Sequence, residues 1–215
     1  MNQTSRRKFI AAAAVLTGAS IVPSMVKAKY GTEGTPESTT WDLSWLEKLK
    51  GKHKQVFDLG ELELRVIPNW LDAYQDVFQI PYSDLNAIVG IAGKAFPINA
   101  SDDLYRKFPI GEHWKLNDPE TQKPAMRNIF LDGGKTPTDQ RKTVRALQAR
   151  GVIFWQCNKA LQRISKDLAE RVKRPEAEVY EELKAGLNPG VILIPAHAML
   201  IGLAQERGCT YEVLW

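Results

Sequence analysis

The chain has 215 residues, with 29 Lys and Arg against 25 Asp and Glu, which gives a formal net charge of +4 at pH 7. Residues 1–28 contain four of the basic side chains and no acidic one, so residues 29–215 carry 25 charges of each sign. This balance gives no electrostatic reason to expect nucleic acid or acidic lipid as a partner, and the length suits one domain with a single core.

The first 28 residues have the order of an export signal. Arg6 and Arg7 precede an apolar stretch, Phe9–Val22, and a small-residue cleavage pattern ends at Ala28. This segment resembles a twin-arginine signal peptide, which implies recognition by the twin-arginine export machinery, cleavage after Ala28 and a periplasmic or other extracytoplasmic location.

Two alternatives remain for this segment: an ordinary secretory signal or an uncleaved membrane span. Gly18, Ser20 and Pro23 interrupt the apolar stretch, and it is shorter than the roughly 20 strongly apolar residues that a span requires. The sequence therefore predicts no permanent membrane span.

Residues 29–52 are expected to form a tether that ends in a short helix. The stretch 29–40 is rich in Gly, Thr, Glu, Pro and Ser, which is typical of a flexible linker. Trp41 and Trp45 follow at helical spacing, and we interpret them as part of a core patch, with Gly51 ending the helix.

Residues 53–215 alternate between strand-like and helix-like segments, five times over. Apolar, strand-like segments are Gln55–Phe57, Leu85–Gly93, Val152–Trp155, Val191–Ile194 and Thr210–Val213. Helical patterns occupy Asn69–Gln79, Asp102–Phe108, Gln140–Arg150, Lys159–Glu170, Glu176–Ala185 and Ala198–Glu206. This order predicts an α/β fold with a five-stranded, mainly parallel, doubly wound sheet of the flavodoxin-like kind and helices on both faces.

Residues 111–139 form an insertion with three prolines, the Gly133-Gly134 pair and little periodicity. A stretch of this length without regular structure inside a domain is usually a lid, an interface arm or a mobile insertion. We expect it to be the least ordered part of residues 53–215.

Ligands of open parallel sheets bind beyond the carboxyl ends of the strands, and several chemically active side chains follow the predicted strands. Asp58 follows the first strand, Lys94 the second, Cys157 and Asn158 the third, and His197 the fourth. The topology therefore predicts a thiol, a cation and an imidazole at one edge, with Lys94 and His197 as neighbours that favour a Cys157 thiolate.

A structural role for Cys157 is the alternative, because free cysteine is among the most buried residue types. Cys157 and His197 alone make weak evidence for a metal site, so we predict none. Cys209 precedes the last strand, at the opposite edge, and should not form a disulfide with Cys157.

Known cofactor and hydrolase motifs are missing. Neither G-x-G-x-x-G nor G-x-x-x-x-G-K-[ST] follows a strand, and no G-x-S-x-G elbow occurs. We therefore expect no nucleotide cofactor and no α/β-hydrolase activity.

Several segments resemble the DsrE/DsrF-like sulfur-relay family. The segments are Arg150–Leu161 with its Gly-Val-x-Phe-x-x-Cys-x-x-Ala-Leu order, Asn188–Pro195, Leu203–Gly208, Ala87–Ile98 and Asp102–Gly111. The resemblance covers most of residues 53–215. It implies a five-stranded α/β fold, homo- or hetero-oligomers and, in some members, a cysteine that carries sulfur as a persulfide.

Cys157 matches the position of that cysteine. The leading hypothesis is an exported, cofactor-free protein that binds or carries sulfur through Cys157, with Lys94, Asn158 and His197 in its binding pocket. The alternative is a non-catalytic subunit that holds a small molecule or a partner in the periplasm.

Overall fold

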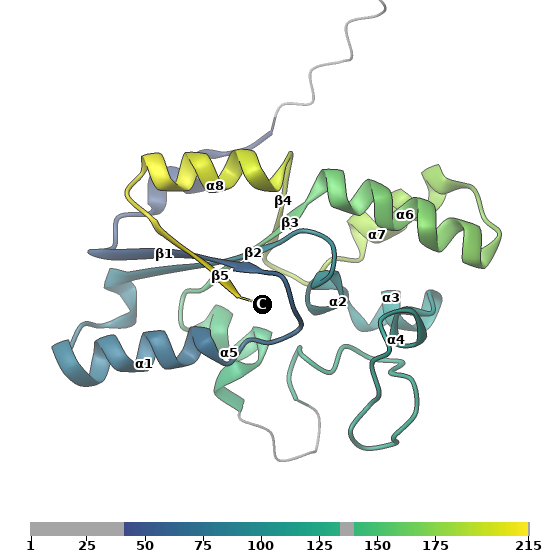
Figure 1. The fold of residues 1–215 in the computed structure, drawn as a ribbon, viewed down its shortest axis with the longest axis horizontal. Coiled ribbons are helices and arrows are strands. Elements are labelled where there is room, and N and C mark those ends of the chain that lie inside the picture. Colours follow the sequence, from purple (N-terminus) through teal and green to yellow (C-terminus); the bar gives the residue numbers. More distant parts are fainter. Residues whose placement is uncertain (1–40, 134–139, 215) are drawn as a thin grey trace, which may run out of the picture. The chain divides into compact units, whose positions relative to one another are not determined.

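Five parallel strands form the centre of the computed structural model, which describes residues 41–133 and 140–214 (Figure 1). The strands lie in the order β4-β3-β2-β1-β5, and all four neighbouring pairs are parallel. Their bounds are β1 His53–Leu59, β2 Leu85–Ile91, β3 Ile153–Cys157, β4 Val191–Ile194 and β5 Thr210–Leu214. The predicted five-stranded, doubly wound α/β fold is therefore confirmed. The expected signal (1–28), its cleavage after Ala28 and the linker 29–40 lie outside the described residues.

Eight α-helices connect and cover the strands within the described part of the chain. They are α1 Val66–Phe78, α2 Phe96–Asn99, α3 Asp102–Lys107, α4 Ile110–His113, α5 Val144–Ala149, α6 Asn158–Val172, α7 Glu176–Ala185 and α8 His197–Glu206. Figure 1 shows α8 over one face of the sheet and α1 and α5 over the other. Helices on both faces explain why the central strands are apolar on both sides.

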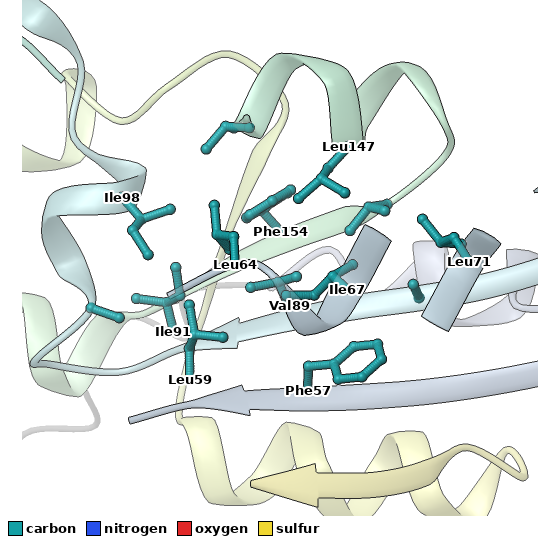
Figure 2. Close-up of a cluster of buried hydrophobic side chains, with 14 of the residues drawn as sticks. Phe57, Leu59, Leu64, Ile67, Leu71, Val89, Ile91, Ile98, Leu147 and Phe154 are labelled. Carbon is teal, nitrogen blue, oxygen red and sulfur yellow. The ribbon is translucent and has the colours of Figure 1, made fainter. Parts of the chain in front are cut away.

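The first face of the sheet packs on α1 and α5 (Figure 2). Phe57, Val89 and Phe154 project from three adjacent strands and are fully buried. Ile67 of α1 and Leu147 of α5 close this layer on the helix side. Such a continuous apolar layer excludes water and stabilises the fold in proportion to the apolar area it buries.

The second face packs on α8 and on a short 3-10 helix, η1, Ser44–Lys48. Val56 and Ile88 point to this face because successive strand residues alternate. Trp45 of η1 packs against Trp155 with ring centroids 6.1 Å apart. Residues 41–52, assigned to the end of the tether from sequence, thus belong to the α/β unit, while the interpretation of Trp45 as core is confirmed.

A third apolar cluster joins α2, α3, α4, α6 and α7. Figure 1 shows these helices beyond the carboxyl ends of the strands. Phe96, Tyr105 and Leu161 are fully buried there. The cluster covers the sheet edge at which the sequence placed the candidate site.

The described part of the 111–139 insertion lacks regular structure from residue 115 onward, as expected, but it is anchored to the domain. Asn128 is 1% exposed and binds the backbone of residues 98 and 100, and Arg127 forms an ion pair with Asp118. Ala125 is also buried. Tertiary hydrogen bonds thus anchor the described residues 111–133 where regular secondary structure is lacking, and residues 134–139 lie outside the described residues. That the insertion is the least ordered part of the domain stays a prediction.

Candidate functional site

Cys157 is the last residue of β3 and directly precedes α6. The apolar β3 run ends there, and Asn158 begins the helix, so the thiol lies at the carboxyl edge predicted from sequence. The Asn158 Oδ1 atom accepts a hydrogen bond of 2.6 Å from the Tyr180 hydroxyl on α7. Cys157 is only 4% exposed, so the thiol lies beneath the helices that cover this edge.

The sulfur of Cys157 accepts a hydrogen bond from the backbone N–H of His197, over 3.4 Å. His197 is the first residue of α8, and Cys157 itself occupies the N-cap position of α6. Helix N-termini carry a positive partial charge and free N–H groups, which stabilise negative charge on a nearby sulfur. The predicted meeting of Cys157 and His197 thus occurs through the main chain of His197.

The His197 ring points away from this contact and toward the second face of the sheet. Its Nδ1 atom accepts from the Trp155 indole Nε1 at 3.0 Å, and its Nε2 atom lies 2.8 Å from Asp58 Oδ1. The Tyr211 hydroxyl donates to the other Asp58 oxygen at 2.8 Å. Four elements, β3, α8, β1 and β5, are joined by this chain of side-chain hydrogen bonds.

The chain of hydrogen bonds changes the acidity of its end members. Burial raises the pKa of Asp58, but the hydrogen bonds from His197 and Tyr211 outweigh it and hold that pKa below its ordinary value. Burial and the hydrogen bond to Asp58 raise the pKa of Tyr211 to about 12. Asp58 is therefore an anion and Tyr211 a neutral donor at neutral pH.

Asp58 lies inside β1, not after it as the sequence suggested, because β1 extends to Leu59. The sequence analysis placed the end of this strand at Phe57, and an ionisable residue inside a buried strand needs hydrogen-bond partners. His197 and Tyr211 supply the hydrogen bonds that make this position tolerable.

Lys94 is exposed and lies at a different place on the same edge. In the described residues no hydrogen bond joins its ammonium group to the Cys157 sulfur. Lys94 lines a groove of about 430 Å³ together with Gly60, Glu61, Leu62, Glu63 and Trp114. The backbone oxygen of Lys94 accepts from the Trp114 indole at 2.9 Å, which places the insertion beside this groove.

A smaller, more apolar cavity of about 180 Å³ adjoins the groove and shares Leu62 and Glu63 with it. Leu64, Ile129 and Phe130 contribute apolar walls, and Lys142 and Thr143 contribute polar atoms. Concave sites with apolar walls and a few polar groups are typical of small-molecule binding.

Cys209 lies at the amino edge, before β5, and neither cysteine is bonded to the other. Burial raises the pKa of Cys209, against the lowering effects of Lys54 and Arg207. This environment favours the neutral thiol. That both cysteines are free agrees with the expectation that they do not form a disulfide.

Sequence reasoning missed three residues of this site: Trp155, Tyr211 and Gly90, which pairs with Asp58 and Trp155 in the sheet and lies beneath the His197 ring. All three lay in strand-like segments and were interpreted only as strand residues. The available signal was Gly90 itself, because a glycine inside a buried strand often marks a close approach by another group.

No protein-family model matches this sequence, and a search of curated proteins found no match. The fold and site together define an α/β protein with a flavodoxin-like sheet and a buried thiol at its carboxyl edge. Residues 41–133 and 140–214 contain no group of three or more His, Cys, Asp or Glu side chains that could hold a metal ion. No helix in these two ranges is long and apolar enough to cross a membrane.

Asp58→Asn should reduce the loss of stability on acidification. The pKa of Asp58 is lower in the folded protein than its ordinary value, so its stabilisation is complete above that ordinary value and is lost as the pH falls through the folded pKa. Urea unfolding of both proteins between neutral pH and about pH 2 measures the difference. Asp76→Asn, on the exposed side of α1, is the matched control. Equal pH dependence in wild type and Asp58→Asn would contradict the assignment.

Proposed function

We propose that this protein works outside the cytoplasm, where it binds or carries sulfur as a persulfide on Cys157. The single observation that supports this most directly is the contact between the Cys157 sulfur and the first N–H of α8. The resemblance of the segments around Cys157 to the DsrE/DsrF-like family supports the same residue.

The proposed reaction needs no cofactor. The Cys157 thiolate attacks the terminal sulfur of a donor persulfide, R–S–SH. The new sulfur–sulfur bond to Cys157 forms as the bond within the donor breaks, and the donor leaves as the thiol R–SH, taking up the proton lost by Cys157. The bound sulfur atom is negatively charged near neutral pH, and the N–H groups at the start of α8 stabilise such charge.

Incubation with a low-molecular-weight persulfide should add the mass of one sulfur atom to the protein. Intact mass spectrometry should show the adduct on wild type and Cys209→Ser, and a reducing thiol should remove it. Cys157→Ser should remain folded and unmodified, because it lacks the nucleophile. An adduct that persists in Cys157→Ser, or that disappears in Cys209→Ser, would contradict the proposal.

A second candidate function is a non-catalytic subunit that binds a small molecule or a partner. The groove and the adjoining cavity at Leu62 and Glu63 favour it, as does the 4% exposure of Cys157. Native mass spectrometry of protein purified from the periplasm would reveal a retained ligand and the oligomeric state. A retained ligand together with no sulfur uptake by Cys157 would select this function.

Replacing Arg6 and Arg7 by lysine should leave the precursor in the cytoplasm. Lysine keeps the positive charge, so the change affects only the paired arginines that the export receptor reads. Fractionation and immunoblotting of the precursor and the mature form would measure the effect. Lys8→Arg, which preserves the pair, is the control, and undiminished export of the double lysine variant would refute the assignment.

A further inference from the structure

The His197 ring occupies the place of a missing side chain on the second face of the sheet. Trp155, Gly90 and Asp58 are register neighbours on β3, β2 and β1, so they form one row across the strands. A Cβ atom at Gly90 would lie 2.8 Å from Trp155 Cζ2 and 3.0 Å from His197 Cε1. The ring enters from α8 and lies above Gly90, between the other two side chains.

The two flanking side chains determine both the orientation and the protonation of the ring. The Trp155 indole N–H can only donate, so His197 Nδ1 must accept and carries no proton. The ring proton is then on Nε2, where it is donated to Asp58. Both ring nitrogens are occupied by these partners, and neither is available to take a proton from the Cys157 thiol.

The backbone N–H of the same residue donates to the Cys157 sulfur. Only two rotatable side-chain bonds separate the His197 ring from its own backbone. A ring that is held at both nitrogens therefore restricts the direction in which the His197 backbone N–H points. Ala196 is the N-cap residue of α8, and its methyl group cannot accept a hydrogen bond that would orient the first N–H groups of the helix.

We infer that the His197 ring positions the first N–H of α8 on the Cys157 sulfur, with Asp58 and Trp155 as further positioning residues. This role rests on the proposed function of Cys157 and differs from that of a general base or an imidazolium neighbour. Gly90 contributes the space that the ring requires.

Comparison of His197→Ala with His197→Gln tests the inference. Glutamine has one neutral acceptor and one neutral donor, as the Nε2–H imidazole has, but it cannot serve as an imidazolium or as a base near neutral pH. The readout is the pH at which the ultraviolet absorbance of the Cys157 thiolate appears in a titration, after subtraction of the same variant carrying Cys157→Ser. This measurement requires neither sulfur uptake nor access of a reagent to the buried thiol.

His197→Ala should shift the ionisation equilibrium toward the neutral thiol about 3- to 10-fold, so that the thiolate absorbance appears at higher pH, as expected for the loss of one well-placed hydrogen bond. His197→Gln should reverse most of this shift, and Gly202→Ala, elsewhere on α8 with no atom within 4 Å of the added Cβ, should leave the equilibrium unchanged. Equal shifts in the Ala and Gln variants would assign the effect to the imidazole itself, and no shift in either would refute positioning.

Nitrogen-15 NMR of the wild-type ring provides a measurement that does not depend on whether these variants fold. A neutral ring with its proton on Nε2 is expected, and a ring protonated on Nδ1 would overturn the inference. Failure of the persulfide experiment, with the difference between the Ala and Gln variants intact, would refute the proposed function and leave the positioning role standing.

Discussion

Asn128→Ala should lower the free energy of unfolding by about 3 kcal/mol, since three side-chain hydrogen bonds contribute about 1 kcal/mol each and the Ala100 carbonyl loses its side-chain partner in the interior. The corresponding fall in melting temperature is about 6–12 °C for a protein of this size. The effect is large because the irregular segment 115–133 has no helix or sheet ladder of its own to hold it.

The partners of Asn128 explain this expectation. Its Nδ2 atom donates to the backbone oxygens of Ile98 at 3.0 Å and Ala100 at 2.7 Å, and its Oδ1 atom accepts from the Phe130 N–H at 2.8 Å. Ile98 keeps a second donor, Asn188, whereas Ala100 and Phe130 lose the side-chain partner. A buried backbone group without a hydrogen-bond partner destabilises the folded state. Truncation of Asn128 therefore lowers the free energy of unfolding by more than the contribution of a single hydrogen bond.

Chemical denaturation of Asn128→Ala and Lys123→Ala would measure the difference. Lys123 is exposed in the same segment, and its truncation should change stability by less than about 0.5 kcal/mol. Equal stabilities of Asn128→Ala and Lys123→Ala would mean that the contacts of Asn128 contribute little to the folded state. In that case the amides of residues 115–133 should also exchange as fast as those of a free loop.

The strands were predictable because burial on both faces selects apolar, β-branched runs. Val191–Ile194 coincides with β4, and Leu85–Ile91 of β2 falls within the predicted run Leu85–Gly93. The helix Glu176–Ala185 also agrees with its predicted bounds. Helical spacing and strand alternation are local properties, so a sequence window contains enough information to identify them.

Errors arose where distant contacts override local pattern. Residues 44–48 form the expected short helix and bury Trp45 and Leu46 against the sheet, but the helix is of the 3-10 kind, which the spacing of its apolar residues does not reveal. Asn128 satisfies backbone atoms about 30 residues earlier in the chain, so the docking of the insertion could not be inferred from its prolines and glycines.

The site was predictable in position but not in mechanism. Parallel topology brings the ends of β3 and β4 to one edge, which is why Cys157 and His197 meet. The sequence offered the His197 imidazole and the Lys94 ammonium as the neighbours of the thiol. The structure instead directs the imidazole toward Asp58 and leaves Lys94 at the groove, because side-chain direction depends on packing between elements.

Gly90→Ala tests the packing on which the positioning of His197 depends. The added Cβ would lie 2.8 Å from Trp155 and 3.0 Å from His197, and both rings are held by the hydrogen bond between them. Overpacking of this kind costs about 1–3 kcal/mol. Alanine in a strand recovers about 0.5–1 kcal/mol relative to glycine, so the expected net loss of stability is up to about 2.5 kcal/mol.

Gly93→Ala is the matched control, because nothing lies within 4 Å of its added Cβ. It should be neutral or stabilising by up to about 1 kcal/mol. Urea unfolding gives the two stabilities, and the ring nitrogen-15 resonances of His197 report whether the imidazole has moved. Because Trp155 is fully buried and its indole cannot retreat without breaking the core, the His197 ring should shift first and its bond to Asp58 should weaken. If Gly90→Ala were as stable as Gly93→Ala and the His197 resonances were unchanged, the space between Trp155 and His197 would accommodate the added methyl group. The His197 ring would then not be held in place by packing.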